Sequence, residues 1–169
     1  MAYAVLQFFH YLGLALLIGG PTFWFLVGRP AVQQEEALDG SDLSELNQTL
    51  KTRIRAGIIA GAVIYVLASF GDIARIAWQL SYDEFDFELF RQILSQTQNG
   101  SVTVLQVVIA VALSVSAWRL PKLWVAPCLL TAFLAITYAW TGHAASGGTP
   151  LLQPLDIVHV LAMGLWGGG

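Results

Sequence analysis

The chain has 169 residues, of which 56% are hydrophobic and 11% charged, and its formal net charge is −3 at pH 7. Its mean hydropathy is +0.65. This composition is too apolar and too poor in charge for an ordinary soluble domain, so it indicates a membrane protein. The basic residues are few and scattered, which argues against nucleic acid as a partner and leaves membrane lipids as the expected surroundings.

Apolar stretches predict an all-α fold, a multi-pass transmembrane helical bundle that forms a single membrane domain. The predicted helices cover about residues 2–27, 54–78, 102–118, 123–141 and 155–169. Because about 20 residues are needed to cross a hydrocarbon core of about 30 Å, we expect four full helices and a fifth partial helix. Pro21 predicts a kink in the first helix, because proline has no N–H to donate.

The two long connections carry helical signals of their own. Asp42 followed by Glu45 resembles a capping box, which predicts that the second helix begins well before its apolar part. Phe85, Leu89 and Ile93 recur at i, i+4 and i+8 opposite acidic residues. This spacing predicts a short helix lying along the membrane surface, with a docking site for a periplasmic partner as the alternative.

The distribution of Lys and Arg predicts the orientation in the membrane. Basic residues gather in the connection after the first helix and in the turn between the third and fourth helices: Arg29, Lys51, Arg53, Arg55, Arg119 and Lys122. By the positive-inside rule both connections face the cytoplasm. The amino terminus is therefore predicted outside.

One phrase occurs twice in the chain. His10 in HYLGLALLIGG precedes Gly19-Gly20 by the same spacing at which His159 in HVLAMGLWGGG precedes Gly168-Gly169. Four crossings return the chain to its starting face, so the repetition predicts a second, parallel repeat that begins near residue 155. The triple glycine at the end predicts that the 169 residues belong to a longer chain.

All three histidines, His10, His143 and His159, are predicted to lie in the outer third of the membrane. Ionisable residues are costly there, which favours a functional site, and imidazole is the commonest metal ligand. Asp156, His159 and Met163 fall at i, i+3 and i+7, on one helix face. A thioether beside imidazoles favours copper, and Cu(I) over Cu(II). These five residues are the candidate metal ligands.

Other readings of the same residues stay open. Each histidine is alternatively a hydrogen-bonding residue between helices, Met163 is alternatively core packing, and Asp156 alternatively orients a histidine without touching the metal. Asp72 and Arg75 are spaced to form an ion pair, with a position at the site entrance as the alternative.

The remaining polar or polarisable groups are predicted to pack. Cys128 is expected to be a small buried hydrophobe rather than part of an inner metal relay, and as the single cysteine it forms no intrachain disulfide. Trp166 is expected to pack inside the fifth segment.

The phrases HYLGLALLIGG, TGHAASG and DIVHVLAMGLWGGG resemble those of the bacterial copper resistance protein D family, CopD. The resemblance implies a multi-helix protein of the bacterial inner membrane that accepts copper at the periplasmic face, in concert with a small periplasmic copper-binding protein, and moves it inward. It carries over His10, His143 and His159 as membrane-facing histidines, and Trp166 with the glycines as a packing signature. The chain is about half the length expected of full-length members and has no Met-rich or His-rich external loop.

Three functions follow. The first is an inner-membrane copper-binding protein that passes copper across the membrane. The second is a haem-binding electron-transfer subunit in which His10 and His159 hold haem b axially. The third is a non-catalytic accessory subunit whose partners are other membrane subunits. An enzyme is not expected, because no nucleophile-base arrangement or phosphate-binding loop is present.

Overall fold

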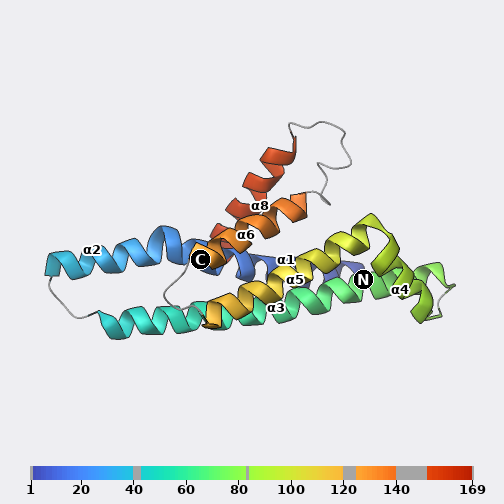
Figure 1. The fold of residues 1–169 in the computed structure, drawn as a ribbon, viewed down its shortest axis with the longest axis horizontal. Helices are drawn as coiled ribbons and strands as arrows, with labels where there is room; N and C mark the ends of the chain where they lie inside the picture. The colour runs from blue at the N-terminus through green and yellow to red at the C-terminus, as the bar shows by residue number, and fades with distance from the viewer. Residues whose placement is uncertain (1, 40–42, 83, 120–124, 140–151, 169) are drawn as a thin grey trace.

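The computed structural model describes residues 2–39, 43–82, 84–119, 125–139 and 152–168, and within these ranges it contains helices and no strand. The all-α prediction is therefore confirmed. The helices are, in chain order, α1 (Ala2–Phe23), the π-helix η1 (Trp24–Gly28), α2 (Arg29–Asp39), α3 (Ser44–Leu80), α4 (Phe87–Gln96), α5 (Gln98–Arg119), α6 (Val125–Ala139) and α8 (Leu152–Gly168). Figure 1 shows their arrangement.

Three of the described helical stretches are long and apolar enough to cross a membrane. They are Tyr3–Glu35, Ser44–Leu80 and Gln98–Trp118, and Val125–Tyr138 is a shorter apolar helix. The exposed side chains of these helices are largely apolar, as contact with membrane lipid requires.

One predicted boundary was wrong: the first helix does not stop at residue 27 but continues through η1 into α2. The prediction that the second helix begins well before its apolar part is confirmed, because α3 begins at Ser44. The sequence Ala-Val-Gln-Gln-Glu-Glu in α2 consists mostly of good helix formers. An apolar stretch therefore marks only the part of a helix that suits the membrane. The helix itself continues as long as its residues favour helical hydrogen bonding.

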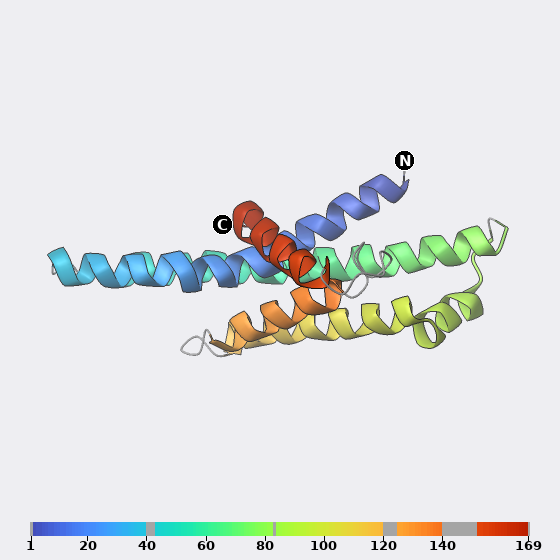
Figure 2. The same ribbon diagram turned by 90° about the horizontal axis from the view of Figure 1, so that it is seen from above.

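The π-helix begins at Trp24, three residues after Pro21. Because proline has no N–H, the carbonyl one turn earlier loses its helical partner and the turns around it loosen. Gly28 lies against the Trp24 ring, where an added Cβ would be 2.9 Å from Cε3. Figure 2 shows that α1 and α2 run in different directions on either side of this turn.

The bundle is held together most closely where α1 crosses α3. A Cβ added to Gly13 would lie 2.7 Å from the backbone nitrogen of Tyr65, and one added to Gly61 would lie 2.7 Å from Cβ of Leu16. Small residues let membrane helices approach backbone to backbone in this way. α1 therefore comes closest to the α3 backbone at Gly13, whereas a Cβ added to Gly20 would lie 3.3 Å from Cγ2 of Ile54 and 3.5 Å from Cγ1 of Ile58.

On the side of this crossing toward α2, apolar side chains fill the space between the helices. We call this region the packed half. Its fully buried members are Leu17 and Ile18 of α1, Ile58 of α3, Leu113 of α5 and Leu134 of α6. α8 contacts α1 and α6 and rises away from the α3–α5 pair (Figures 1 and 2).

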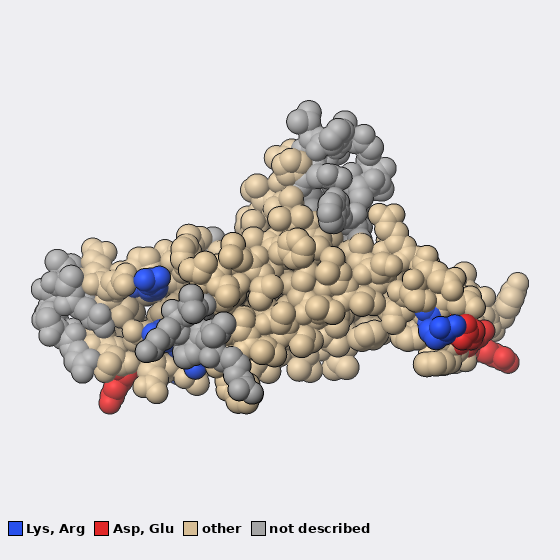
Figure 3. Space-filling view, in the orientation of Figure 1, with Lys and Arg blue, Asp and Glu red and all other residues tan. Residues whose placement is uncertain are grey.

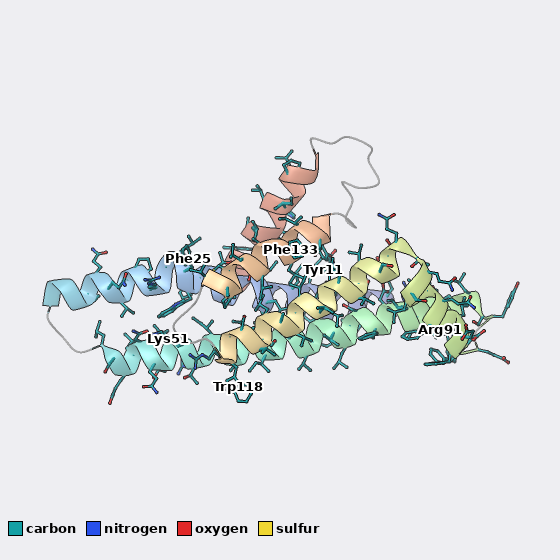
Figure 4. All side chains as sticks on the ribbon, viewed as in Figure 1. Tyr11, Phe25, Lys51, Arg91, Trp118 and Phe133 are labelled. Carbon is teal, nitrogen blue, oxygen red and sulfur yellow. The ribbon has the colours of Figure 1, made fainter. Side chains whose placement is uncertain are left out.

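Charged residues occupy the two ends of the bundle. In Figure 3 mostly basic side chains, with some acidic atoms, show at the end formed by α2 and the start of α3, and acidic and basic side chains lie together at the α4 end. Figure 4 shows Lys51 toward the first end and Arg91 at the second. Lys51 stacks on the Trp24 ring, with Nζ 5.3 Å from the ring centroid. The middle of the bundle, which must lie in hydrocarbon, is free of such groups on the face shown in Figure 3.

Candidate functional site

A cavity of about 610 Å³ opens among the helices near the α4 end, beyond the Gly13–Gly61 crossing. α1, α3, α4, α5, α6 and α8 all contribute to its wall. We call this region the pocket half, in contrast to the packed half. The same helices therefore meet closely at one level and separate around a cavity at another.

Polar residues reach this cavity as stripes on otherwise apolar helices. α1 contributes Tyr3, Gln7 and His10, α5 contributes Asn99, Thr103 and Gln106, and α3 contributes Ser69 and Asp72. The α1 and α5 residues are each spaced i, i+4, i+7, so every set lies on one helix face. Polar stripes on two membrane helices that face the same cavity indicate a binding site rather than a lipid-facing surface.

His10 lies in an aromatic setting. Its ring centroid is 4.5 Å from that of Tyr65 and 5.9 Å from that of Tyr138. Among the described residues, none forms a hydrogen bond with a ring nitrogen of His10. The aromatic contacts fix the ring by packing and leave its nitrogen lone pair available to a ligand in the cavity.

A buried hydrogen bond lies behind His10. The Tyr65 hydroxyl donates to Oε1 of Gln106 over 2.9 Å, and the two residues are 0% and 4% exposed. Ser69 Oγ donates to the Tyr65 carbonyl over 2.7 Å. The Gln106 amide nitrogen, Nε2, has no partner within the described part of the chain, although Gln106 lines the cavity. Gln106 therefore carries a buried amide donor without a described partner beside the cavity.

The predicted Asp72–Arg75 ion pair is confirmed. An oxygen of Asp72 lies 2.9 Å from Arg75 Nη2, and the Arg75 guanidinium stacks 5.0 Å from the Tyr3 ring centroid. Asp72 also lines the cavity. The pair neutralises the only carboxylate among the described lining residues.

The structure brings together three of the predicted metal ligands and leaves two outside its description. His10 of α1 and His159 and Met163 of α8 line the same cavity. His143 lies outside the described residues, and although α8 includes Asp156, the side chain of Asp156 also lies outside the description. In the described ranges, no three His, Cys, Asp or Glu side chains are close enough to hold one metal ion. The five-residue set therefore stays a prediction.

Two predictions about packing have different outcomes. Trp166 of α8 is 90% exposed, because no described helix covers it. The prediction that this side chain packs against neighbouring residues is therefore wrong. Cys128 is half-buried, with Sγ 3.6 Å from the Pro21 carbonyl oxygen, which agrees with a packing residue beside the π-turn.

The predicted short helix is present as α4, which begins at Phe87, two residues after Phe85. The Asp86 carboxylate caps it by accepting from the backbone N–H groups of Glu88 and Leu89, over 2.8 and 3.1 Å. Ile93 on its apolar side lines the cavity. On its exposed side, hydrogen bonds from Arg91 lower the pKa of the Glu88 carboxyl. α4 thus covers one end of the cavity while its charged face points to solvent.

Sequence reasoning from histidines missed the amide and phenol groups of the site. Gln106, Tyr65 and Tyr138 received no role, although Asn99, Thr103 and Gln106 form a polar stripe that the sequence displays. That stripe could have been found by asking which polar residues in each apolar helix share one face. Tyr65 could not, because a tyrosine in an apolar helix has no distinctive neighbours.

Comparison with known proteins identifies the family. The family model described as "Copper resistance protein D-like, N-terminal domain" matches residues 1–151 of this chain. The matched range includes His10 and His143, and it ends before His159 and Met163. A search of the curated proteins and a search of the solved structures each found no match. The chain belongs to the copper resistance protein D-like family, and it is a multi-pass membrane protein of that family.

Proposed function

We propose that this protein binds copper in the pocket half, accepts it from the periplasmic side of the bacterial inner membrane and passes it across the membrane. His10, His159 and Met163 are the proposed ligands within the described residues, and His143 and Asp156 are proposed to complete or orient the set. The observation that carries the proposal is that imidazoles from two helices far apart in sequence line one cavity together with a thioether.

The donor set suits Cu(I). Two imidazoles and one thioether provide soft and borderline ligands, which favour Cu(I) over hard cations such as Mg²⁺ or Ca²⁺. Three neutral ligands leave the bound ion with a single positive charge. The Asp72–Arg75 pair at the same cavity is neutral overall, so it neither repels the cation nor holds it permanently.

Passage inward would require the packed half to open. The apolar side chains that fill the packed half present no ligand in the described residues apart from Cys128, which touches Pro21 beside the π-helix. Loosened turns of this kind often mark places where a helix moves. We therefore place the moving element of the proposed transport step at Pro21 to Gly28.

The proposal is tested by measuring bound metal. Protein purified in detergent after growth with both copper and iron is analysed by mass spectrometry for metal content, and its Cu(I) affinity is measured by competition with a chelator. We expect copper near one equivalent in the wild type. We expect His10→Ala, His159→Ala and Met163→Leu each to weaken Cu(I) binding by about tenfold or more, since even partners of a ligand change affinity by about 10- to 100-fold.

The matched control is Val158→Ala, because Val158 is an exposed neighbour of His159 on α8. Equal copper affinity in Val158→Ala and His159→Ala would remove His159 from the site. An absorption spectrum of the same preparation distinguishes haem, since a Soret band with stoichiometric iron would replace the copper proposal by haem b. The absence of metal from all variants would favour an accessory subunit.

The orientation needs its own experiment. Cys128 is replaced by Ala, and single cysteines are placed at Tyr82, beside α4, and at Gln34, on α2; both native residues are exposed. A membrane-impermeant maleimide applied to intact spheroplasts is expected to label the cysteine at 82 and not that at 34. The reverse labelling would place the amino terminus and the cavity on the cytoplasmic side.

A further inference from the structure

The cavity is much larger than a copper ion requires. Its volume of about 610 Å³ lies within the range of about 300–1,000 Å³ that is typical of small-molecule pockets. The proposed copper ligands belong to α1 and α8, whereas Ser69, Asn99, Thr103 and Gln106 line it from α3 and α5. Copper binding by the proposed ligands therefore does not explain the polar residues on the α3–α5 side of the cavity.

Gln106 indicates what this side of the cavity could bind. The side chain is 4% exposed, Tyr65 occupies its Oε1, and Nε2 has no partner in the described part of the chain. A buried amide donor without a partner costs about 1–3 kcal/mol. A ligand that presents an acceptor oxygen to Nε2 would recover that cost.

The remaining wall limits the class of ligand. The described lining includes no Lys or Arg, and its one carboxylate is paired with Arg75, so an anion would have no counter-charge and a phospholipid head group no basic partner. The wall includes the aromatic residues Tyr3, Tyr11 and Tyr138 and the aliphatic residues Ile73 and Ile76. Such a wall fits a flat, neutral, mostly apolar molecule.

We infer that the pocket half binds the head group of a membrane-soluble quinone, with Gln106 Nε2 donating to a quinone carbonyl oxygen. Quinones combine a flat ring, a carbonyl acceptor and solubility in the bilayer, which are the properties that the wall selects. The Tyr65 hydroxyl is the positioning group, because its hydrogen bond to Oε1 holds the Gln106 amide in place at the cavity wall. This inference does not depend on copper, because it uses the α3–α5 side of the cavity.

The test measures binding of a short-tailed ubiquinone to the metal-free, detergent-purified protein by isothermal titration calorimetry. Gln106→Leu alone would leave the Tyr65 hydroxyl buried without a partner, so the variant is Tyr65→Phe/Gln106→Leu, which removes both polar groups together. Tyr65→Phe alone keeps the amide, and Val108→Ala, exposed on α5 away from the cavity, is the control. Thermal unfolding of each variant establishes that it is folded.

We expect saturable binding in the wild type, the Val108→Ala control and Tyr65→Phe. We expect the double variant to bind about fivefold more weakly than Tyr65→Phe, which corresponds to the loss of one hydrogen bond.

Equal affinity in all four proteins, or heat that grows without saturation, would overturn the inference. Displacement of the quinone by an added anionic phospholipid would overturn it as well. A protein that binds quinone but no copper would refute the proposed function alone.

Discussion

The packed half and the pocket half are built from the same helices, yet they differ in every respect that matters for function. In the packed half Leu17, Ile58 and Leu113 fill the space between α1, α3 and α5. In the pocket half the corresponding faces carry His10, Asp72 and Gln106, and the helices leave a cavity. The contrast teaches that a membrane bundle can keep its stability in one layer and tolerate costly polar groups in the next, because helices tied at one crossing need not touch along their whole length.

The largest expected effect comes from removing the crossing that separates the halves. Gly61→Leu would force a side chain into Leu16 and the α1 backbone, and we expect the free energy of unfolding to fall by about 3 kcal/mol. The measurement is reversible unfolding in detergent. Gly57→Leu on the same helix is the control, since nothing lies within 4 Å of an added Cβ there. An equal loss of stability in both variants would show that the close contact between α1 and α3 at Gly61 does not stabilise the bundle.

The same kind of substitution in the pocket half should affect binding and spare the fold. Ala15 lines the cavity on α1, so we expect the added atoms of Ala15→Leu to extend into the cavity. We expect the unfolding free energy to change by less than about 1 kcal/mol and Cu(I) affinity to fall by about tenfold. Chelator competition and unfolding of the same sample measure both. A large loss of stability would show that the pocket half is packed as tightly as the other half.

Tyr65 connects the two halves, because its backbone contacts Gly13 and its hydroxyl reaches Gln106. Tyr65→Phe deletes that hydroxyl and keeps the ring against His10. We expect a loss of about 1 kcal/mol in unfolding free energy, since hydrogen bonds between membrane helices contribute about 0.6 kcal/mol on average and up to about 1.7. No change would show that Gln106 is satisfied equally well without tyrosine.

The smallest effect is expected in α4, which covers the cavity end. Hydrogen bonds from Arg91 lower the pKa of Glu88, so the ionised carboxylate stabilises the folded helix. That stabilisation is fully present above the unfolded pKa, about 4.3, and is lost as the pH falls through the lower, folded-state pKa. The protection of the α4 amides, measured against their intrinsic exchange rate at the same pH, should therefore fall as the pH drops below the unfolded pKa in the wild type and change less in Glu88→Gln. An equal change in both would assign the effect to the Asp86 cap.

Much of the architecture was visible in single segments of the sequence. The apolar stretches predicted the membrane helices, the Asp72–Arg75 spacing predicted their ion pair, and the Phe85–Ile93 periodicity predicted α4. The length of the first helix was mispredicted because hydropathy reports the solvent around a helix and not the end of its hydrogen bonding. Trp166 was misjudged for the opposite reason: its apolar ring suggested burial, but no described helix lies over it.

The sequence by itself determined the membrane class, the helices and the polar stripe along each helix, because all three follow from composition and from the 3.6-residue period of a hydrogen-bonded backbone. Only the tertiary structure decided that His10, His159 and Met163 line one cavity and that Gln106 faces it. Which stripes meet depends on how the helices cross. That crossing is decided by close contacts such as Gly13 against Tyr65 and Gly61 against Leu16, between residues far apart in the chain.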